Sequence, residues 1–404
     1  MAYELAYVFA AGPTGEQHLA GTLESKTGAG TFTYAASWLA NDWAYPLDPL
    51  NLPLSTKRYR ALNKHGLFGV FCDAAPDDWG TRIMLLRHQH APANELERLI
   101  RTSGDGVGCL RYSLSRGQAK VPAPLPTMQH LHDLAKAAEK LELKHKLAPE
   151  ELALLEPGSS MGGARPKVTV ADDETRWLVK FAKAGDLVDV PLLEYCSMQF
   201  LKDVLGLNVP ETRLINVGGK NAFAIVRFDG AANSPKHFIS ANSLFNQDRI
   251  RPIEDSKRNP YSYCNLASII RKHCSNFKED NKELFVRMVA NIVMGNTDDH
   301  ARNHALLFDI TTAKWQLSPA YDMLPIVATR SGLQAMGVGD HGAKATLENA
   351  LSYANLFGLK TTEAQALCKK VSSAYTGWPA YCLQNGMQAT DVQLVQGAML
   401  KELN

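Results

Sequence analysis

The amino-acid sequence predicts an α+β protein with a β-rich N-terminal part and a helical C-terminal part. Three observations support this prediction. In residues 30–34 the side chain of Phe32 faces one way and its two threonine neighbours face the other, which is typical of a half-buried strand. Residues 157–229 alternate between short strand-like and helix-like segments after a glycine-rich loop. From about residue 260 the apolar residues recur with helical spacing instead.

The composition is that of an ordinary globular protein. The chain has 404 residues, enough for about two or three domains, and 45% are hydrophobic and 21% charged. The formal net charge of +2 gives no general attraction to polyanions, although it leaves room for a local basic groove. No apolar run approaches the roughly 18 residues of a membrane helix, and residues 1–11 lack the basic start of a signal peptide. We therefore expect a cytoplasmic protein without a membrane partner.

The cysteines predict neither a disulfide framework nor a zinc site made of cysteines. There are 7 of them, an odd number, and no two stand in a C-x-x-C motif. We therefore expect buried thiols in a protein that works in a reducing compartment.

Residues 1–120 are the first predicted domain, which is mostly β with turns. Residues 45–53 hold three prolines, so this segment is expected to be a turn or an extended edge. Residues 75–80 are expected to be a turn that leads into a helix with Asp77 or Asp78 as its N-cap. The apolar face of that helix is expected to comprise Ile83, Leu85 and Leu86.

Residues 121–235 are the second predicted domain, in which strands and helices alternate. Three alternating prolines in residues 121–126 favour a stiff connector, and a helix is expected from about residue 127 to 146. The remaining elements are expected at 167–170, 177–181, 212–216 and 222–228 for the strands and at 192–205 for a second helix. This alternation predicts an antiparallel α+β block.

Residues 236–404 are the third predicted domain, which is mainly helical. Its clearest helix carries apolar side chains at i, i+3, i+4, i+7 and i+8, namely Leu284, Phe285, Met288, Val289, Ile292 and Val293. The helix is expected to end at Gly295, because glycine is favoured at a helix C-cap. A hairpin of 305–309 and 315–317 follows, and the tail from residue 344 is expected to be helical.

The densest polar cluster of the sequence is the segment 295–304, between the predicted buried helix and the hairpin. Loops held by rigid elements commonly carry function. Asp298 and Asn303 have the D-x-x-x-x-N spacing of a phosphoryl-transfer loop, where the aspartate accepts the hydroxyl proton and the asparagine binds magnesium. The hairpin could bring Asp322 back beside Asn303, which would give one Mg²⁺ two oxygen ligands.

Two other interpretations of this cluster stay open at this stage. The spacing arises often by chance, and the segment could be a capped helix end followed by a polar turn. It could also be the transition-metal centre of a hydrolase. The ligands of that centre would be Asp298, Asp299, His300 and His304.

A glycine-rich loop and a strand lysine precede the cluster. The loop, 158–167, is not a Walker A motif, but its glycines would let backbone N–H groups approach phosphates, with a plain flexible turn as the alternative. Lys180 lies in a predicted strand, and Glu194 opens the next helix. A kinase uses such a pair to hold the ATP phosphates, although a lone pair is more often a solvated surface pair.

The order of these motifs along the chain is that of a protein kinase: glycine-rich loop, strand lysine, helix glutamate, D-x-x-x-x-N loop, hairpin and aspartate. There is no His-Arg-Asp or Asp-Phe-Gly sequence, so a standard eukaryotic-type kinase is excluded. We therefore predict a two-lobed protein-kinase-like fold with an N-terminal β-rich subdomain and a helical C-terminal lobe.

These residues resemble the HipA family of bacterial serine/threonine kinases, the toxin halves of toxin–antitoxin pairs. The resemblance covers residues 15 to about 380 and is most specific at 296–303 and 318–322. Other matching segments are 32–34, 38–39, 53–54, 75–80, 104–112, 160–167 and 227–229. The resemblance implies that the three predicted domains are the coupler subdomain (1–120), the ATP-binding part (121–235) and the lobe with the catalytic loop (236–404).

The resemblance also implies a role for each matching residue. Asp298 would be the catalytic aspartate, and Asn303 and Asp322 would be the magnesium ligands. The implied nucleotide-binding residues are Ser160, Gly162, Gly163, Lys180, Glu194, Arg227, Phe228, Asp229 and His300. Among them, Phe228 and Asp229 would receive adenine and ribose, and His300 would brace the catalytic loop. Ser160 would be the loop serine that can be autophosphorylated.

Two positions depart from the family pattern. Val226 stands where the best-known members have a glutamate beside the hinge, so only its carbonyl could accept the adenine amino group. Arg165 and Pro166 stand where glutamine and glutamate are common.

The resemblance implies an ATP- and Mg²⁺-dependent serine/threonine-protein kinase that also autophosphorylates its glycine-rich loop. Its protein substrate could be translation-related, such as an aminoacyl-tRNA synthetase. A helix-turn-helix antitoxin is the expected partner, with DNA contacted only through that partner. The alternatives are a small-molecule kinase and a catalytically silent module that binds the antitoxin. The presence of Lys180, Asp298, Asn303 and Asp322 argues against the silent module.

Overall fold

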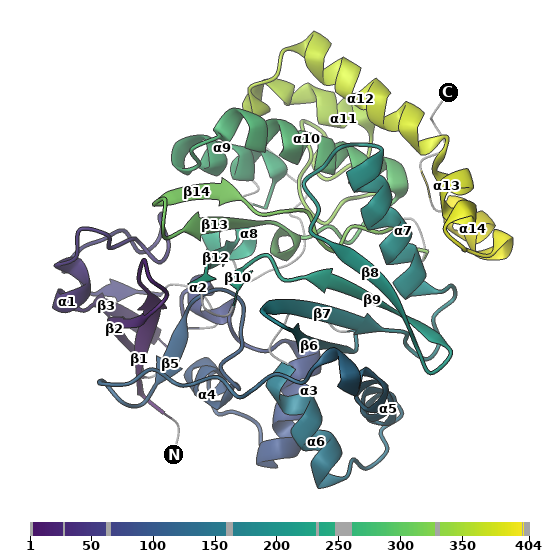
Figure 1. Cartoon of the computed structure of the whole chain (residues 1–404). Coiled ribbons are helices and arrows are strands. Elements are labelled where there is room, and N and C mark those ends of the chain that lie inside the picture. The colour runs from purple at the N-terminus through teal and green to yellow at the C-terminus, as the bar shows by residue number, and fades with distance from the viewer. Residues whose placement is uncertain are drawn as a thin grey trace. The chain divides into compact units, whose positions relative to one another are not determined.

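The computed structural model describes residues 3–26, 29–61, 66–158, 165–231, 234–246, 261–327, 332–397 and 399 (Figure 1). The chain divides into two compact units. Unit 1 comprises Met1–Ala184, Ile215–Asp248 and Leu307–Lys314. Unit 2 comprises Gly185–Leu214, Arg249–Leu306 and Trp315–Asn404. The three-domain division with boundaries at residues 120 and 235 stays a prediction.

Unit 1 begins with a five-stranded sheet in the order β4-β3-β2-β1-β5, with every pair antiparallel. Its strands are β1 (Leu5–Ala11), β2 (Gln17–Lys26), β3 (Ala29–Tyr34), β4 (Tyr59–Arg60) and β5 (Arg111–Ser113). Burial alternates along β3, and Phe32 is fully buried. The predicted strand at 30–34 and its two faces are therefore confirmed.

Four helices accompany this sheet in the sequence, namely α1 (Ala36–Leu39), α2 (Gly69–Cys72), α3 (Asp78–His88) and α4 (Glu95–Arg101). The predicted N-cap of α3 is confirmed, because the Asp77 carboxylate accepts from the backbone N–H groups of Trp79 and Gly80 at 3.1 and 3.4 Å. The predicted apolar face of α3 is partly wrong. Ile83 is buried, but Leu85 and Leu86 are 36% and 45% exposed.

The reason lies in where the buried stripe of α3 is centred. The buried residues are Trp79, Gly80, Ile83 and Met84. At 100° per residue this stripe places Leu85 on the far side of the helix and Leu86 at the margin. The large indole of Trp79 sets the buried side, and the prediction omitted that residue.

A second sheet in the order β6-β7-β9-β8 lies mostly in unit 1, and its β6–β7 and β7–β9 pairs are antiparallel. Its strands are β6 (Lys167–Asp172), β7 (Thr175–Phe181), β8 (Thr212–Val217) and β9 (Lys220–Val226). Helices α3, α5 (Leu131–Glu142) and α6 (Pro149–Leu155) pack against it in one hydrophobic cluster (Figure 1). Short 3₁₀ helices flank them at Met128–His130 and Glu156–Gly158. The predicted antiparallel α+β block is confirmed, whereas α6 was not predicted and the helix expected to reach residue 146 ends at Glu142.

Unit 2 is mainly helical, as predicted. Its helices are α7 (Val190–Asp203), α9 (Tyr263–His273), α10 (Phe277–Met294), α11 (Leu347–Ser352), α12 (Thr361–Tyr375), α13 (Trp378–Gln384) and α14 (Ala389–Gln396), with 3₁₀ turns at Ala301–Asn303 and Ala354–Phe357. Helix α7 begins two residues earlier than predicted, because Asp189 caps it by accepting from the N–H of Leu192 at 3.0 Å. Helix α10 carries the predicted apolar face and ends at Gly295, whose φ of 76° is left-handed.

Short elements complete the described chain. They are β10 (Gly230–Ala231), β11 (Ser234–Pro235), β12 (His237–Ser240), α8 (Ala241–Leu244), β13 (Ala305–Asp309) and β14 (Lys314–Leu317). The predicted hairpin is confirmed as β13 and β14. All 7 cysteines are free, and five of them are buried. Among the described helices, none combines the length and hydropathy that a membrane span requires.

One buried carboxyl in the proline-rich segment predicts a pH-dependent stability. Asp48 is fully buried, and it accepts from the N–H groups of Leu50 and Asn51 at 2.9 Å each. Burial raises the pKa of Asp48 to about 6, against the hydrogen bonds that lower it. Between pH 4 and about 6 the folded chain therefore binds more protons at this site than the unfolded chain. The free energy of unfolding should fall over that window by roughly 3 kcal/mol as the pH rises.

The measurement is urea unfolding at pH 4, 5, 6 and 7 for the wild type and for Asp48→Asn. The variant should gain stability relative to the wild type as the pH rises, because it has no carboxyl to ionise. Asp42→Asn, at an exposed site, is the matched control and should track the wild type. A wild-type-to-variant difference that is constant with pH would contradict the assignment.

Candidate active site

The segment that contains the predicted catalytic residues is tied to the end of α10. The left-handed Gly295 turns the chain out of the helix. Asn296 then binds back to Asn291 of α10 twice, through its backbone N–H at 2.9 Å and through its side-chain amide at 2.9 Å. The loop 296–303 therefore starts from a fixed point on a buried helix.

Asp299 is the buried anchor of this loop. Its carboxylate is fully buried and accepts from the Tyr263 hydroxyl, from the Asn291 amide at 2.7 Å and from His304 Nε2 at 2.9 Å. Burial alone would raise the pKa of Asp299, but His304 and the hydrogen bonds from His304 and Tyr263 outweigh burial and lower it. The carboxylate is thus held ionised between α9, α10 and the end of the loop, which makes it a structural group.

Asp298 has a different environment from its neighbour. Its backbone N–H donates to the Asn296 side chain at 3.3 Å, and its carbonyl accepts from Asn303 Nδ2 at 3.4 Å and from the N–H of His300 at 2.8 Å. Within the described part of the chain, no hydrogen bond reaches its carboxylate. Burial raises the pKa of Asp298, and the negative charge of Asp322 adds to this increase, against the opposing effect of His300. A carboxylate so placed can accept a proton.

Asp322 lies near Asp298 because the segment after β14 returns to the loop. The Ser318 N–H donates to the Ala305 carbonyl at 2.9 Å, and the Tyr321 hydroxyl donates to the Arg302 carbonyl at 2.7 Å. Asp322 itself has a φ of 59°, in the left-handed region that aspartate tolerates better than most residues. The structure therefore brings Asp322 within electrostatic range of Asp298, whose carbonyl binds Asn303.

The chemistry of these donors fits a magnesium ion. Asp298 and Asp322 are like charges close enough to perturb each other, and a divalent cation between such groups would relieve the repulsion. The amide nitrogen of Asn303 is used by the Asp298 carbonyl, so Oδ1 is the atom that could bind a cation. Carboxylate and amide oxygens are the ligands that Mg²⁺ prefers. Ligation by Asn303 and Asp322 stays a prediction.

The transition-metal alternative receives no support from the geometry. Among the described residues, no group of three or more His, Cys, Asp or Glu side chains is placed to hold a metal ion. Asp299 and His304, two of its four ligands, bind each other instead. The capped-helix interpretation is correct as local structure, but it does not account for the approach of Asp322.

Some predicted nucleotide-binding residues lie apart from this cluster or outside the described chain. Lys180 is buried in β7 of unit 1, with its Nζ 6.0 Å from the ring centre of Phe223. Glu194 is buried in α7 of unit 2, so the Lys180–Glu194 pair stays a prediction. The backbone carbonyl of His300 accepts from the N–H of Asn303 at 2.8 Å, and a bracing role for the His300 side chain stays a prediction. Three residues lie outside the described residues, namely Ser160, Gly162 and Gly163.

The predicted hinge residues follow β9 and form a buried ion pair. Arg227 donates to both Asp229 carboxylate oxygens, at 3.1 and 2.6 Å, and Arg176 lies 3.6 Å from the same carboxylate. Burial would raise the pKa of Asp229, but Arg227 and Arg176 outweigh it and lower the pKa. Phe228 lies 6.4 Å from the ring of Phe238. Adenine and ribose binding at Phe228 and Asp229 stays a prediction, and the ion pair between Arg227 and Asp229 was not predicted from the sequence.

Comparison with known families identifies the chain. Residues 159–378 match the model of the HipA-like C-terminal domain, and residues 15–113 match that of the HipA N-terminal domain. The chain belongs to the HipA family. The resemblance found in the sequence is therefore confirmed, and all the predicted site residues lie within residues 159–378.

Two curated relatives of this chain carry kinase names. A Haemophilus influenzae protein named "Putative kinase" is 29% identical over 140 residues, which cover 33% of this chain and 40% of the relative. "Putative kinase Y4mE" of Sinorhizobium fredii is 23% identical over 336 residues, which cover 78% of this chain and 77% of the relative. The first match thus spans less than half of the relative's length.

A solved structure shows the same fold. A chain of the Shewanella oneidensis MR-1 toxin–antitoxin complex of HipA, HipB and operator DNA superposes with a TM-score of 0.71 at 16% identity. The superposition covers 97% of this chain and 94% of that chain. The predicted fold class, α+β and two-lobed with a helical C-terminal lobe, is confirmed.

Proposed function

We propose that the chain is a kinase that transfers the γ-phosphoryl group of ATP to a serine or threonine hydroxyl of a protein. The observation that carries the proposal is the convergence of Asp298, Asn303 and Asp322 at the end of α10. The kinase names of the two curated relatives support it. Membership of the HipA family supports it as well.

In this reaction the residues of the chain would have different roles. Asp298 accepts the proton of the attacking hydroxyl while the new oxygen–phosphorus bond forms and ADP leaves with the electrons of the broken bond. Asn303 and Asp322 would hold magnesium, which would neutralise charge on the phosphates. Lys180 holds the phosphates, with Glu194 to orient it. Positioning and electrostatics supply the catalysis, and no covalent enzyme intermediate is needed.

Two finer features belong to the same proposal. Phosphorylation of Ser160 would add about −1.5 to −2 charge to the glycine-rich loop and switch the enzyme off by ejecting the loop from the ATP site. A helix-turn-helix antitoxin is the proposed partner, supported by the HipA–HipB–DNA assembly of the structural neighbour. DNA would be contacted through that partner.

Removal of the Asp322 carboxylate should weaken ATP–magnesium binding by roughly tenfold or more, since even outer-shell partners of a metal contribute 10–100-fold. The measurement is titration calorimetry of ATP with and without Mg²⁺, on the wild type, Asp322→Ala and Asp322→Asn. The asparagine variant is the matched control for the left-handed backbone, so it isolates the lost charge. Wild-type protein that binds no ATP with Mg²⁺ would favour the catalytically silent module.

The class of phosphate acceptor needs a separate experiment. Labelled phosphate from γ-labelled ATP should appear in protein and be released as phosphoserine or phosphothreonine on acid hydrolysis. Label found only in metabolites would instead indicate a small-molecule kinase.

A further inference from the structure

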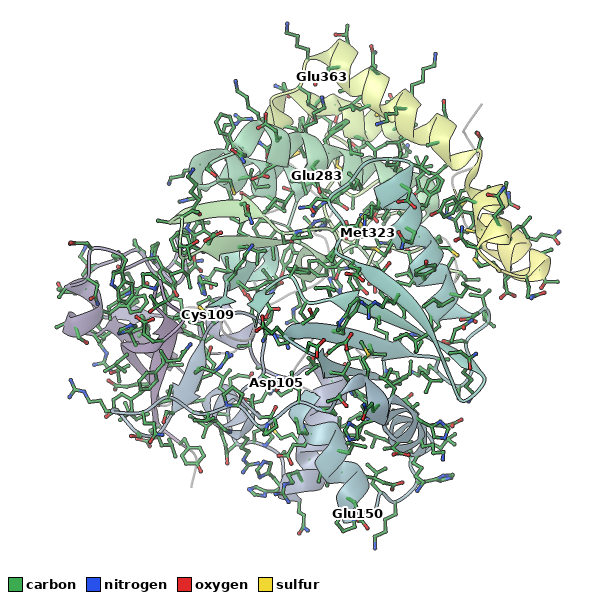
Figure 2. The ribbon with its side chains drawn as sticks, viewed as in Figure 1. Asp105, Cys109, Glu150, Glu283, Met323 and Glu363 are labelled. Carbon is green, nitrogen blue, oxygen red and sulfur yellow. The ribbon has the colours of Figure 1, made fainter. Side chains whose placement is uncertain are left out.

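A loop of the N-terminal region contacts the proposed nucleotide hinge directly, within unit 1. Arg227 donates to the backbone carbonyls of Asp105 and Gly106 at 3.0 and 3.1 Å. The backbone N–H of Gly108 donates to the Asp229 carboxylate at 2.8 Å. Asp105 is labelled in Figure 2, in the segment that leads toward Cys109. The loop 104–108 therefore binds both charged residues of the hinge. Two of its carbonyls bind Arg227, and one of its N–H groups binds Asp229.

The glycines of the loop are required by its shape. Gly104 and Gly108 have left-handed φ values of 88° and 79°, which side chains other than glycine rarely adopt. A Cβ on Gly106 would lie 2.4 Å from the carbonyl oxygen of Ala74, so this part of the loop packs directly on backbone. The Gly-Asp-Gly-Val-Gly sequence thus permits the close approach of the loop carbonyls to Arg227.

The contact is buried and charged, so it resists small displacements. Arg227 and Asp229 are 5% and 1% exposed. The Arg227 guanidinium is planar, and its donors are divided between the carboxylate and the two loop carbonyls in fixed directions. A shift of the loop would leave a buried charge without its acceptors unless the hinge moved with it.

We propose that the loop 104–108 positions the hinge for the nucleotide, so that the N-terminal region sets the affinity for ATP. Residues of the loop would act through Arg227 and Asp229, as positioning residues without contact to the reacting atoms. This inference rests on the proposed function. Its physical basis is that binding groups displaced by about 1 Å lose much of their contribution.

The test compares Gly106→Ala with Gly117→Ala. The first substitution forces the loop off Ala74, whereas a Cβ at Gly117 meets nothing within 4 Å, in the same N-terminal region. For Gly106→Ala we expect the KM for ATP to rise about tenfold and kcat to stay within about twofold, because the reacting groups are untouched. Amide hydrogen exchange of residues 226–231, measured without ATP, should become faster. Gly117→Ala should match the wild type in both measurements.

The outcomes separate this inference from the proposed function. An active wild type whose KM and hinge exchange are unchanged by Gly106→Ala overturns the inference alone. Equal losses in kcat and kcat/KM, with general loss of exchange protection, show destabilisation and also overturn it. A wild type without ATP turnover rejects the proposed function, and the exchange data then still decide whether the loop holds the hinge. If Gly106→Ala fails to fold, Arg227→Lys, which keeps the charge and loses the planar fork, should give the same rise in KM.

Discussion

Asp298→Ala should lower the rate of phosphoryl transfer by roughly 10²–10⁴-fold if Asp298 is the general base. The reason is the position of its carboxylate, which belongs to an exposed residue, lies near Asp322 and is reached by no hydrogen bond from the described residues. A single-turnover assay at saturating ATP and Mg²⁺ measures the effect on the chemical step. An unchanged rate would reject the role of Asp298 as base.

The matched control for this prediction is Asp298→Asn, which keeps the size of the side chain and removes its basicity. It should be as slow as the alanine variant, since the proton acceptor is missing in both. Both variants should unfold at nearly the wild-type urea concentration, because the loop is held through the backbone of Asp298 and through Asp299.

Asp299→Ala, one residue further along, should cost stability instead. Removal of its carboxylate leaves the Tyr263 hydroxyl, the Asn291 amide and His304 without their common acceptor in a fully buried site. Truncation of one partner of a buried charged network costs roughly 3–5 kcal/mol. Urea unfolding followed by circular dichroism measures this loss.

Asp299→Asn provides the graded control, because it keeps one acceptor oxygen and loses the charge. Its loss of stability should lie between those of the wild type and the alanine variant. A midpoint for Asp299→Ala that equals the wild type would show that the network does not anchor the loop. We therefore expect different effects from the two neighbouring substitutions: Asp298→Ala should lower the rate of phosphoryl transfer, and Asp299→Ala should lower the stability.

Local patterns made part of the structure predictable. The spacing of apolar residues in α10, the glycine at its end and the alternation in β3 are set by the chain's own geometry, so each was confirmed. Asp77 or Asp78 was predicted as the cap of α3 for the same reason, and Asp77 binds N–H groups only two and three residues further along the chain. The approach of Asp322 to Asp298 needed only a hairpin of the expected length.

Features that depend on distant partners were not predictable in this way. Asp299 was grouped with possible metal ligands, because nothing in the sequence shows that Tyr263 and Asn291 point at it. Arg227 and Asp229 stand only two residues apart in the sequence. The carbonyls of the loop 104–108 that also accept from Arg227, however, are more than a hundred residues away. The buried side of α3 was misjudged for a related reason: the sheet beneath it, rather than the helix pattern alone, selected Trp79.

The anchoring of Asp299 has a consequence for how the loop 296–303 can move. Its three donors come from α9, from α10 and from the end of the loop itself, so the loop cannot open while both helices keep their places. Segments bound in this way belong to one cooperative folding unit and exchange their amides only when that unit opens as a whole. Substitutions that loosen the packing of α9 on α10 would then displace Asp298 without touching it. The same buried contacts would therefore both hold the proposed catalytic carboxylate in place and stabilise the helical core.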